Sequence, residues 1–197
     1  MEIFDISQEV FSCEVYEGDP NPKREAICSI ENGSLYNLTA FSMCAHNGTH
    51  IDAPYHFFAN GKTVDALPLN KTVGLCYVAE FYGVLSSIDA EKIYTRAFNL
   101  DKEASKRQLL KGDLVVSAEA ARFFADKKID LIGNESQTVG PIEAPMEVHK
   151  ILLSQDVVLL EGIRLGKVQE GVYFLSAAPL SLSRADGSPC RAVLIRM

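Results

Sequence analysis

Three of the four histidines in this chain lie within one short segment, together with an aspartate. The segment covers residues 46–56 and reads His-Asn-Gly-Thr-His-Ile-Asp-Ala-Pro-Tyr-His. Neutral imidazole is the commonest metal ligand in proteins, and carboxylate oxygen suits zinc, manganese and iron. Because the four side chains are this dense and are separated by a glycine and a proline, they indicate a metal site rather than unrelated histidines.

The spacing within the segment explains how these side chains could surround one ion. His50 and Asp52 are two residues apart, so on an extended backbone they point to the same side. His46 precedes Asn47-Gly48, a dipeptide that favours a reversal of the chain and can bring His46 back towards His50. We therefore expect these three side chains to be ligands of one metal. The last histidine, His56, would be aimed at the same site.

A purely structural metal is the first alternative. Structural zinc sites usually have four protein ligands and favour cysteine. Cys44 lies two residues before His46, but we expect it to point to the other side of its strand, and the chain contains no C-x-x-C pair. We therefore do not expect Cys44 to be a ligand, which weakens this alternative.

The fourth histidine lies far along the chain. His149 belongs to an expected helix over 146–153, and Glu161 follows an apolar segment, 157–160, that is typical of a buried strand. Ends of buried strands commonly carry site residues, and residues 154–156 favour a reversal that lets both side chains approach one region. Taken singly, each also fits an exposed surface position. Their spacing alone does not join them to residues 46–56.

The elements that must position these side chains alternate between strands and helices. Apolar and β-branched segments predict strands at 26–30, 35–44, 75–82, 114–117, 129–132, 157–160, 173–175 and 192–195. Periodic segments predict helices at 89–97, 119–126 and 146–153, whereas 101–110 fits either a helix or an exposed loop. Gly48 and Pro54 argue against a helix over 46–56 and place the histidines on a loop leaving a strand. Asp186-Gly187 is expected to be a turn between the last two strands.

Strands outnumber helices in this pattern and the two are interleaved. That predicts an α/β or α+β class with a mixed sheet that curls towards a barrel. The 197 residues fit one domain, 1–197, with ample length to bury a core.

Composition and missing motifs exclude several classes of function. The formal net charge of -7 argues against nucleic-acid and anionic-membrane partners. No apolar stretch approaches the roughly 20 residues of a membrane span, and the first residues lack the pattern of a secretory signal. The five scattered cysteines are typical of free thiols in a reducing cytoplasm. No G-x-G-x-x-G, Walker or G-x-S-x-G motif occurs, which argues against nucleotide use and a serine hydrolase.

The segment resembles the signature of the cyclase-like metal-dependent hydrolases, the family that contains bacterial kynurenine formamidases (arylformamidases). Its H-x-G-T-H-x-D-x-P-x-H pattern is matched in full by His46, Gly48, Thr49, His50, Asp52, Pro54 and His56. Glu161 twelve residues after His149, and residues 185–189 followed by Arg191, are similar too. The resemblance covers essentially the whole chain.

This resemblance implies a role for each side chain. A first metal would be held by His46, His50 and Asp52. Asp52 would bridge to a second metal held by His149, and Glu161 would contact both ions. His56 would donate or accept a proton. The metals are usually zinc, two per subunit, with manganese in some relatives.

The resemblance also implies a fold, an assembly and a reaction. The expected fold is a single compact α/β domain with a barrel-like mixed sheet and flanking helices, of the swivelling β/β/α type, which assembles as a homodimer or larger homo-oligomer. The expected reaction is hydrolysis of a small amide by metal-activated water, with N-formylkynurenine, which yields kynurenine and formate, as one possible substrate.

Departures from the family pattern leave the substrate open. Kynurenine formamidases carry a substrate-contacting tryptophan in a Trp-Pro-Gly-Asp-like stretch, but here the stretch begins with Tyr16 and the chain has no tryptophan. Tyr16 could still stack on an aromatic ring. Residues 133–136 also differ from the usual Gly-x-Asp-x-x-Ser pattern. Phe57 and Phe58 fit either core packing or an apolar substrate pocket.

Three alternatives therefore stay open. One is a hydrolase of another formamide, cyclic amide, imide or lactone. Another is a cyclase or dehydratase that uses the same metal centre. The third is a metal-dependent binding module without catalysis, although the presence of His56 argues against it.

Overall fold

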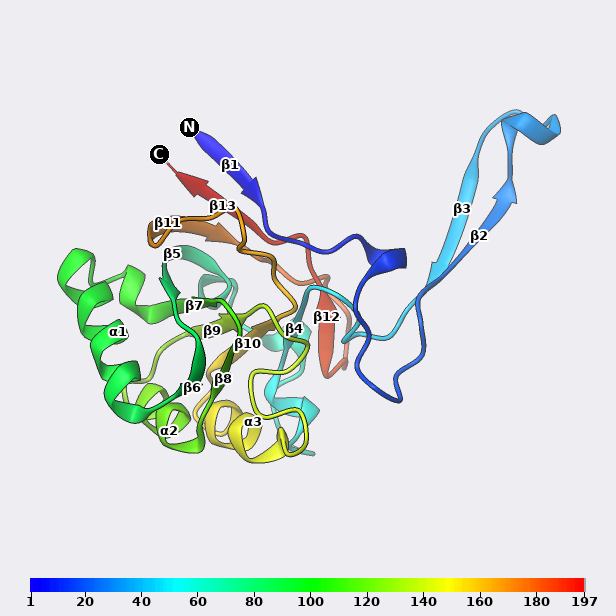
Figure 1. Ribbon diagram of the computed structural model, residues 1–197. Coiled ribbons are helices and arrows are strands. Elements are labelled where there is room, and N and C mark those ends of the chain that lie inside the picture. The colour runs from blue at the N-terminus through cyan, green and yellow to red at the C-terminus, as the bar shows by residue number, and fades with distance from the viewer. Residues whose placement is uncertain (197) are drawn as a thin grey trace.

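The chain folds around one curled sheet of nine strands, described over residues 1–196 by a computed structural model (Figure 1). The strand order is β1-β13-β11-β5-β7-β9-β10-β4-β12. Its strands are β1 (Glu2–Asp5), β4 (His50–Asp52), β5 (Val73–Glu80), β7 (Arg107–Lys111), β9 (Leu131–Asn134), β10 (Val158–Glu161), β11 (Gly171–Ser176), β12 (Gly187–Pro189) and β13 (Val193–Arg196). The four central strands, from β5 to β10, are parallel, and the flanking strands are antiparallel. This mixed sheet confirms the expected class.

Three α-helices cover one face of the sheet: α1 (Ser87–Leu100), α2 (Ala118–Asp126) and α3 (Met146–Leu153) (Figure 1). Hydroxyl groups cap the first two, since Ser86 accepts from the Asp89 amide and Ser117 from the Ala120 amide. The bounds of α3 agree with the predicted 146–153. None of the helices in residues 1–196 has the length and apolar character needed to cross a membrane.

Two smaller sheets and several single turns complete the chain. One small sheet pairs β6 (Gly83–Leu85) with β8 (Leu114–Val116), and the other pairs β2 (Lys23–Cys28) with β3 (Leu38–Ser42). The 3-10 turns are Val10–Ser12, Ile30–Asn32, Pro54–His56, Val64–Ala66, Leu69–Lys71 and Ala104–Lys106.

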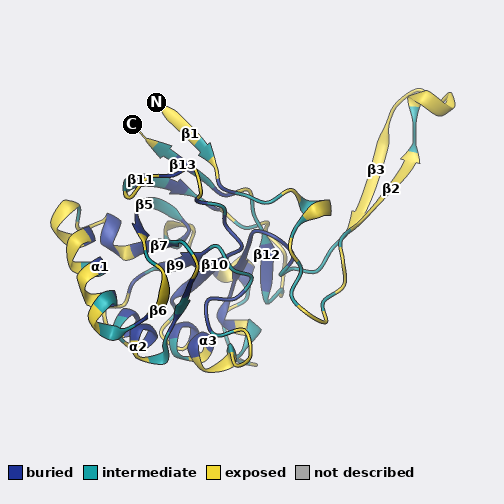
Figure 2. Cartoon of the chain, viewed as in Figure 1, coloured by how far each residue is buried: buried dark blue, intermediate teal, exposed yellow. Residues whose placement is uncertain are grey.

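The alternation of side chains along the strands builds two hydrophobic cores. On β5, Tyr77 and Ala79 pack beneath the helices, while Cys76 and Val78 fill the inside of the curled sheet. Figure 2 shows the central strands almost entirely buried. Because both faces of the sheet are covered, a polar side chain in these strands needs a partner.

The expectation of a helix or exposed loop over 101–110 is wrong. Residues 107–111 form β7, a buried strand between β5 and β9. The polar start of this strand hides it in the sequence, because Arg107 is a buried cation. Its guanidinium donates to the carbonyl oxygens of Lys71 (3.1 Å) and Leu75 (2.9 Å) and lies 3.3 Å from the Asp130 carboxylate.

Two further strands differ from the sequence expectation. Gly187 does not sit in a simple turn, because it begins β12, which pairs with β4. The acidic first residues form β1, an edge strand that pairs with β13 and that the sequence pattern does not predict. Both strands extend the sheet at its two edges, so neither shows the continuous apolar character of the central strands.

Candidate metal centre

A cross-strand pair joins the two distant parts of the sequence. β4 and β10 are antiparallel, with His50 opposite Glu161 and Asp52 opposite Leu159. Because side chains alternate along a strand, Ile51 enters the inner core and both His50 and Asp52 point to the helix side, as Glu161 does from β10. There α3 brings His149 against the same carboxylates. The expected loop over 46–56 is therefore wrong in part, because residues 50–52 form a strand and residues 54–56 form a 3-10 turn.

A tight turn returns His46 to this face. The Asn47 side-chain oxygen accepts from the Cys44 amide at 2.8 Å, and Gly48 adopts a positive φ of +65°. A Cβ atom at Gly48 would lie 2.9 Å from the Cβ of Cys13. The chain reversal predicted at Asn47-Gly48 is confirmed.

Two groups of potential ligand atoms share Asp52. In the first group, Asp52 Oδ1 lies 2.8 Å from His46 Nδ1 and 3.3 Å from His50 Nε2. In the second, Asp52 Oδ2 lies 3.7 Å from His149 Nε2, and the ligand atoms within each group lie within 4.8 Å of one another. Glu161 repeats this arrangement, since Oε2 faces His50 at 3.5 Å and Oε1 faces His149 at 3.2 Å. Each carboxylate thus presents one oxygen to each group.

Backbone carbonyl groups fix the orientation of two imidazoles. His50 Nδ1 lies 2.9 Å from the Gly48 carbonyl oxygen, and His149 Nδ1 lies 2.8 Å from the Pro145 carbonyl oxygen. In each ring Nδ1 is therefore the donor, which leaves Nε2 to face the carboxylates. This hydrogen bond on the far nitrogen is the usual support of a metal-ligating histidine.

The electrostatics of the cluster suit a cation. Burial disfavours the imidazolium, but hydrogen bonds to Asp186 and Asp52 outweigh it and raise the pKa of His46 to about 11. Burial is likewise outweighed by the carboxylates at His50 and His149, where each pKa rises to about 9. Burial opposes ionisation of Asp52, yet its histidine partners hold its pKa well below the usual range. Protons thus occupy positions that a divalent cation would fill.

Asp186 is the functional candidate that sequence reasoning missed. Its Oδ2 lies 2.9 Å from His46 Nε2 and 3.1 Å from His56 Nδ1, so one carboxylate joins both rings. The hydrogen bond with His46 is the main cause that lowers the pKa of Asp186. A Cβ atom at Gly187 would lie 2.6 Å from Cε1 of His46, so glycine at this position lets the backbone lie close to the His46 ring. The sequence does not reveal this role of Asp186, because Asp-Gly is also typical of an ordinary turn.

His56 lies at the open side of the cluster. It ends the 3-10 turn Pro54–His56, its side chain is partly exposed, and its ring centroid lies 4.1 Å from that of His46 and 6.3 Å from that of His149. A histidine that is reachable from solvent and held beside buried ligand groups has the position required of a proton donor or acceptor.

The chain is similar to a known family of proteins. A family model described as "Putative cyclase" matches residues 4–117. Kynurenine formamidases from Erythrobacter litoralis and Bacillus cytotoxicus are 32% and 33% identical to the chain, over 98% of its length and 93% and 97% of theirs. The chain belongs to this cyclase family. The resemblance found in the sequence is confirmed.

Solved structures give the same answer for the fold. A protein described as a potential metal-dependent hydrolase with cyclase activity has a TM-score of 0.81 at 31% identity, over 98% of this chain and 96% of that one. A predicted metal-dependent hydrolase from Bacillus stearothermophilus has a TM-score of 0.78 at 29% identity, over 98% and 97%. Isatin hydrolase A from Labrenzia aggregata, at 20% identity and a TM-score of 0.80 over 100% and 94%, shares the fold.

Three further side chains singled out in this cyclase-family sequence make other contacts. The Tyr16 hydroxyl donates to the Ile142 carbonyl oxygen at 3.2 Å, and the same loop donates from the Val139 amide to Glu161 Oε1 at 2.7 Å. The Phe57 ring packs against His149, with centroids 5.0 Å apart. Cys44 Sγ instead lies 3.9 Å from an Asp19 oxygen.

Metal uptake by the purified, metal-free protein is expected to release protons. The histidines with raised pKa hold protons at pH 7.5, and a metal needs neutral imidazole, so affinity should rise as the pH increases from 6 to 9. The stability that these protons give the metal-free protein is complete below pH about 6.5 and is lost as pH rises through about 9, for His50 and His149, and through about 11, for His46. Calorimetric titration with Zn²⁺ in buffers of different ionisation enthalpy measures the release; pH-independent binding without protons would contradict it.

Proposed function

We propose that this chain is a metal-dependent amidohydrolase of the arylformamidase type. In this proposal His46, His50 and Asp52 hold one metal ion, and Asp52 bridges to a second held with His149 and Glu161. The observation that carries it is that Asp52 and Glu161 each turn one oxygen to either histidine group. Two carboxylates and three imidazoles form an N/O donor set that suits zinc, with manganese as the second choice.

The chain's own residues would bind, orient and protonate. A bound divalent ion supplies water that ionises near neutral pH and a Lewis acid for a carbonyl oxygen. Asp186, through His46 Nε2 and His56 Nδ1, sets the orientation of one ligand ring and of the proton-transfer ring. His56 Nε2 is then free to exchange a proton with substrate, and delivery to the leaving nitrogen completes cleavage of an amide.

The substrate proposed is a small aryl formamide, with N-formylkynurenine first among the candidates because the relatives at 32–33% identity are kynurenine formamidases. Tyr16 is proposed to contact it. The Tyr16 hydroxyl donates to the Ile142 carbonyl oxygen, in the same loop whose Val139 amide donates to Glu161, which supports this contact. A tyrosine in place of the family's tryptophan offers a smaller stacking surface and a polar hydroxyl.

The assembly and the compartment are further parts of the proposal. We infer a homodimer or larger homo-oligomer. The five cysteines are free thiols, which supports work in the reducing cytoplasm.

Elemental analysis combined with a substrate panel tests this function. Purified protein should carry about two zinc or manganese ions per chain and release formate from an aryl formamide, with loss of activity after chelation and recovery with Zn²⁺. The panel should include cyclic imides, isatin-like lactams and lactones. A product lighter by one water would indicate a dehydratase or cyclase instead, and full metal loading without any turnover would indicate a binding module.

A further inference from the structure

The outer part of the histidine cluster forms a third set of possible ligand atoms. His46, His56 and Asp186 each offer one atom to this set, and the three atoms lie within 4.8 Å of one another. Asp186 Oδ2 lies 2.9 Å from His46 Nε2 and 3.1 Å from His56 Nδ1. Tetrahedral ligands at roughly 2.0–2.2 Å from zinc are about 3.3–3.6 Å apart, so small movements would admit an ion. We call these three residues the outer set, and the two sets that share Asp52 the inner sets.

The exposure of the side chains falls steeply from the outer set to the inner sets. Asp186 and His56 are 41% and 29% exposed, and His46 is 13% exposed. The other four ligand candidates are only 1–4% exposed: His50, Asp52, His149 and Glu161. A hydrated cation can therefore reach the outer set from solvent, whereas the inner sets have almost no contact with solvent.

His46 connects the outer set to an inner set, because its ring offers one nitrogen to each. Nε2 faces Asp186, and Nδ1 lies 2.8 Å from Asp52 Oδ1. An ion that leaves the outer set therefore has a ligand of an inner set beside it. A cation that moved directly from water into the buried sets would lose its hydration before protein ligands replaced it, and burying an unpaired charge is costly. Exchange of ligands one at a time avoids this cost.

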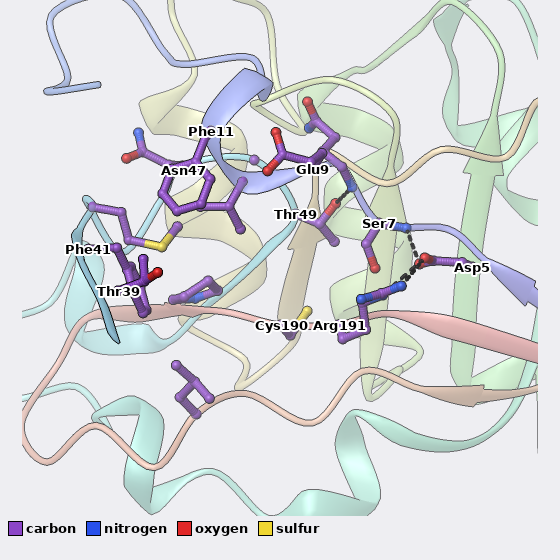
Figure 3. Close-up of a pocket in the computed structure, with 16 residues that line it drawn as sticks. Asp5, Ser7, Glu9, Phe11, Thr39, Phe41, Asn47, Thr49, Cys190 and Arg191 are labelled. Atoms are coloured by element: carbon purple, nitrogen blue, oxygen red, sulfur yellow. Dashed lines mark hydrogen bonds and ion pairs between the residues drawn. The ribbon is translucent and has the colours of Figure 1, made fainter. Parts of the chain in front are cut away.

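Two other approaches to the inner sets are covered. Beside α3, the Phe57 ring packs against His149 and against His56, with centroid distances of 5.0 Å and 4.6 Å. A groove of about 800 Å³ reaches the turn at residues 47–49, but within residues 1–196 its lining includes none of the ligand candidates (Figure 3). There the Thr49 hydroxyl holds the turn closed by donating to the backbone carbonyl oxygen just after β10 at 2.7 Å. The path past His56 is therefore the exposed one.

We propose that the outer set is the entry site for divalent metal ions, and that His46 passes each ion from it to the inner sets. This inference rests on the proposed function, because it assumes that the inner sets hold metal. On entry, a hydrated ion exchanges bound water for Asp186 Oδ2 and His56 Nδ1, and the protons that lie between these atoms pass to solvent. The ion then exchanges these ligands for Asp52 and His50. The net charge of -7 favours the approach of a cation.

Rates of Co²⁺ uptake by the metal-free protein test the entry site without measuring turnover. Loss of an entry site raises the barrier to entry and exit alike, so His56→Ala should slow both uptake and release to excess EDTA by about tenfold or more. The dissociation constant should stay close to that of wild type, because His56 belongs to neither inner set. Stopped-flow absorption of bound Co²⁺ gives both rates, and competition with a chelating dye gives the dissociation constant independently.

Two further variants in the same 3-10 turn serve as controls. Tyr55→Ala removes an exposed ring next to His56 that is not a metal ligand, so it should take up Co²⁺ at the wild-type rate. His56→Asp places a carboxylate oxygen as many bonds from the backbone as Nδ1 is. It should restore most of the uptake rate, because carboxylate oxygen is also a metal ligand, although the imidazole is gone.

The pattern of rates decides between the possible roles of His56. A wild-type uptake rate in His56→Ala would overturn the entry site and leave the proposed function intact. Slow uptake with unchanged release would also overturn it, because the affinity would then be lower and His56 would be a ligand of the final site. A wild-type protein that binds no Co²⁺ at all would contradict the metal centre itself, and thus both the proposed function and the entry site.

Discussion

Asp52→Asn is expected to lower amide hydrolysis by about a thousandfold or more and to reduce the metal content to one ion or none per chain. Loss of a partner outside the ligand set already costs 10–100-fold in affinity or activity, and Asp52 is the group shared by both sets of histidines. Asparagine keeps the size of the side chain but provides only one oxygen and no charge. The measurement is elemental analysis after dialysis against Zn²⁺, together with initial rates at saturating substrate.

Asp130→Asn is the matched control for this experiment. It removes a carboxylate from a partly buried ion pair, 3.3 Å from the Arg107 guanidinium, but Asp130 precedes β9 at the end of the parallel strands opposite to Glu161. The control should keep two ions and most of its activity. An Asp52→Asn protein that retains both ions and near wild-type rates would refute the bridging role, and circular dichroism of both variants separates this result from unfolding.

Local spacing predicts part of this centre because β-strand geometry is local. The two-residue interval between His50 and Asp52 fixes a common side for them on any extended backbone, and the structure realises it in β4. The turn at Asn47-Gly48 is equally local, since a side-chain acceptor and a positive φ suffice. The helix 146–153 also follows from periodicity alone.

The pairing of β4 with β10 is not local, and no pattern in the sequence sets His50 opposite Glu161. In the sequence, only the family resemblance joins His149 and Glu161 to the first cluster. Asp186 shows the same limit, because a carboxylate before glycine is a turn signal whether or not two imidazoles lie beside it. The sequence pattern does not predict β7, because this strand begins with the polar Arg107, whose partners are carbonyl groups of another segment.

His56→Ala is expected to lower turnover by about a hundredfold or more while leaving two metal ions bound. His56 Nδ1 donates to Asp186 at 3.1 Å, and His56 joins His46 and Asp186 in a third set of possible ligand atoms but neither of the two sets that contain Asp52. Its removal is therefore expected to take away proton transfer while both sets around Asp52 keep their ligands. The loss should appear in kcat, with KM changed little, and it should be larger for a poor leaving amine than for an activated anilide, because a good leaving group needs less protonation.

Asp186→Asn provides the control that separates proton transfer from metal binding. In the wild-type background it should cost about ten- to a hundredfold, since it loosens both the His46 and His56 rings. In the His56→Ala background, the part of the Asp186→Asn effect on activity that acts through His56 is absent. The two losses of activity should therefore not multiply. If they multiply fully, or if His56→Ala also loses zinc, then His56 belongs to the ligand set and the proton must be carried by another group. Activity and metal content of the four proteins in this cycle distinguish these outcomes.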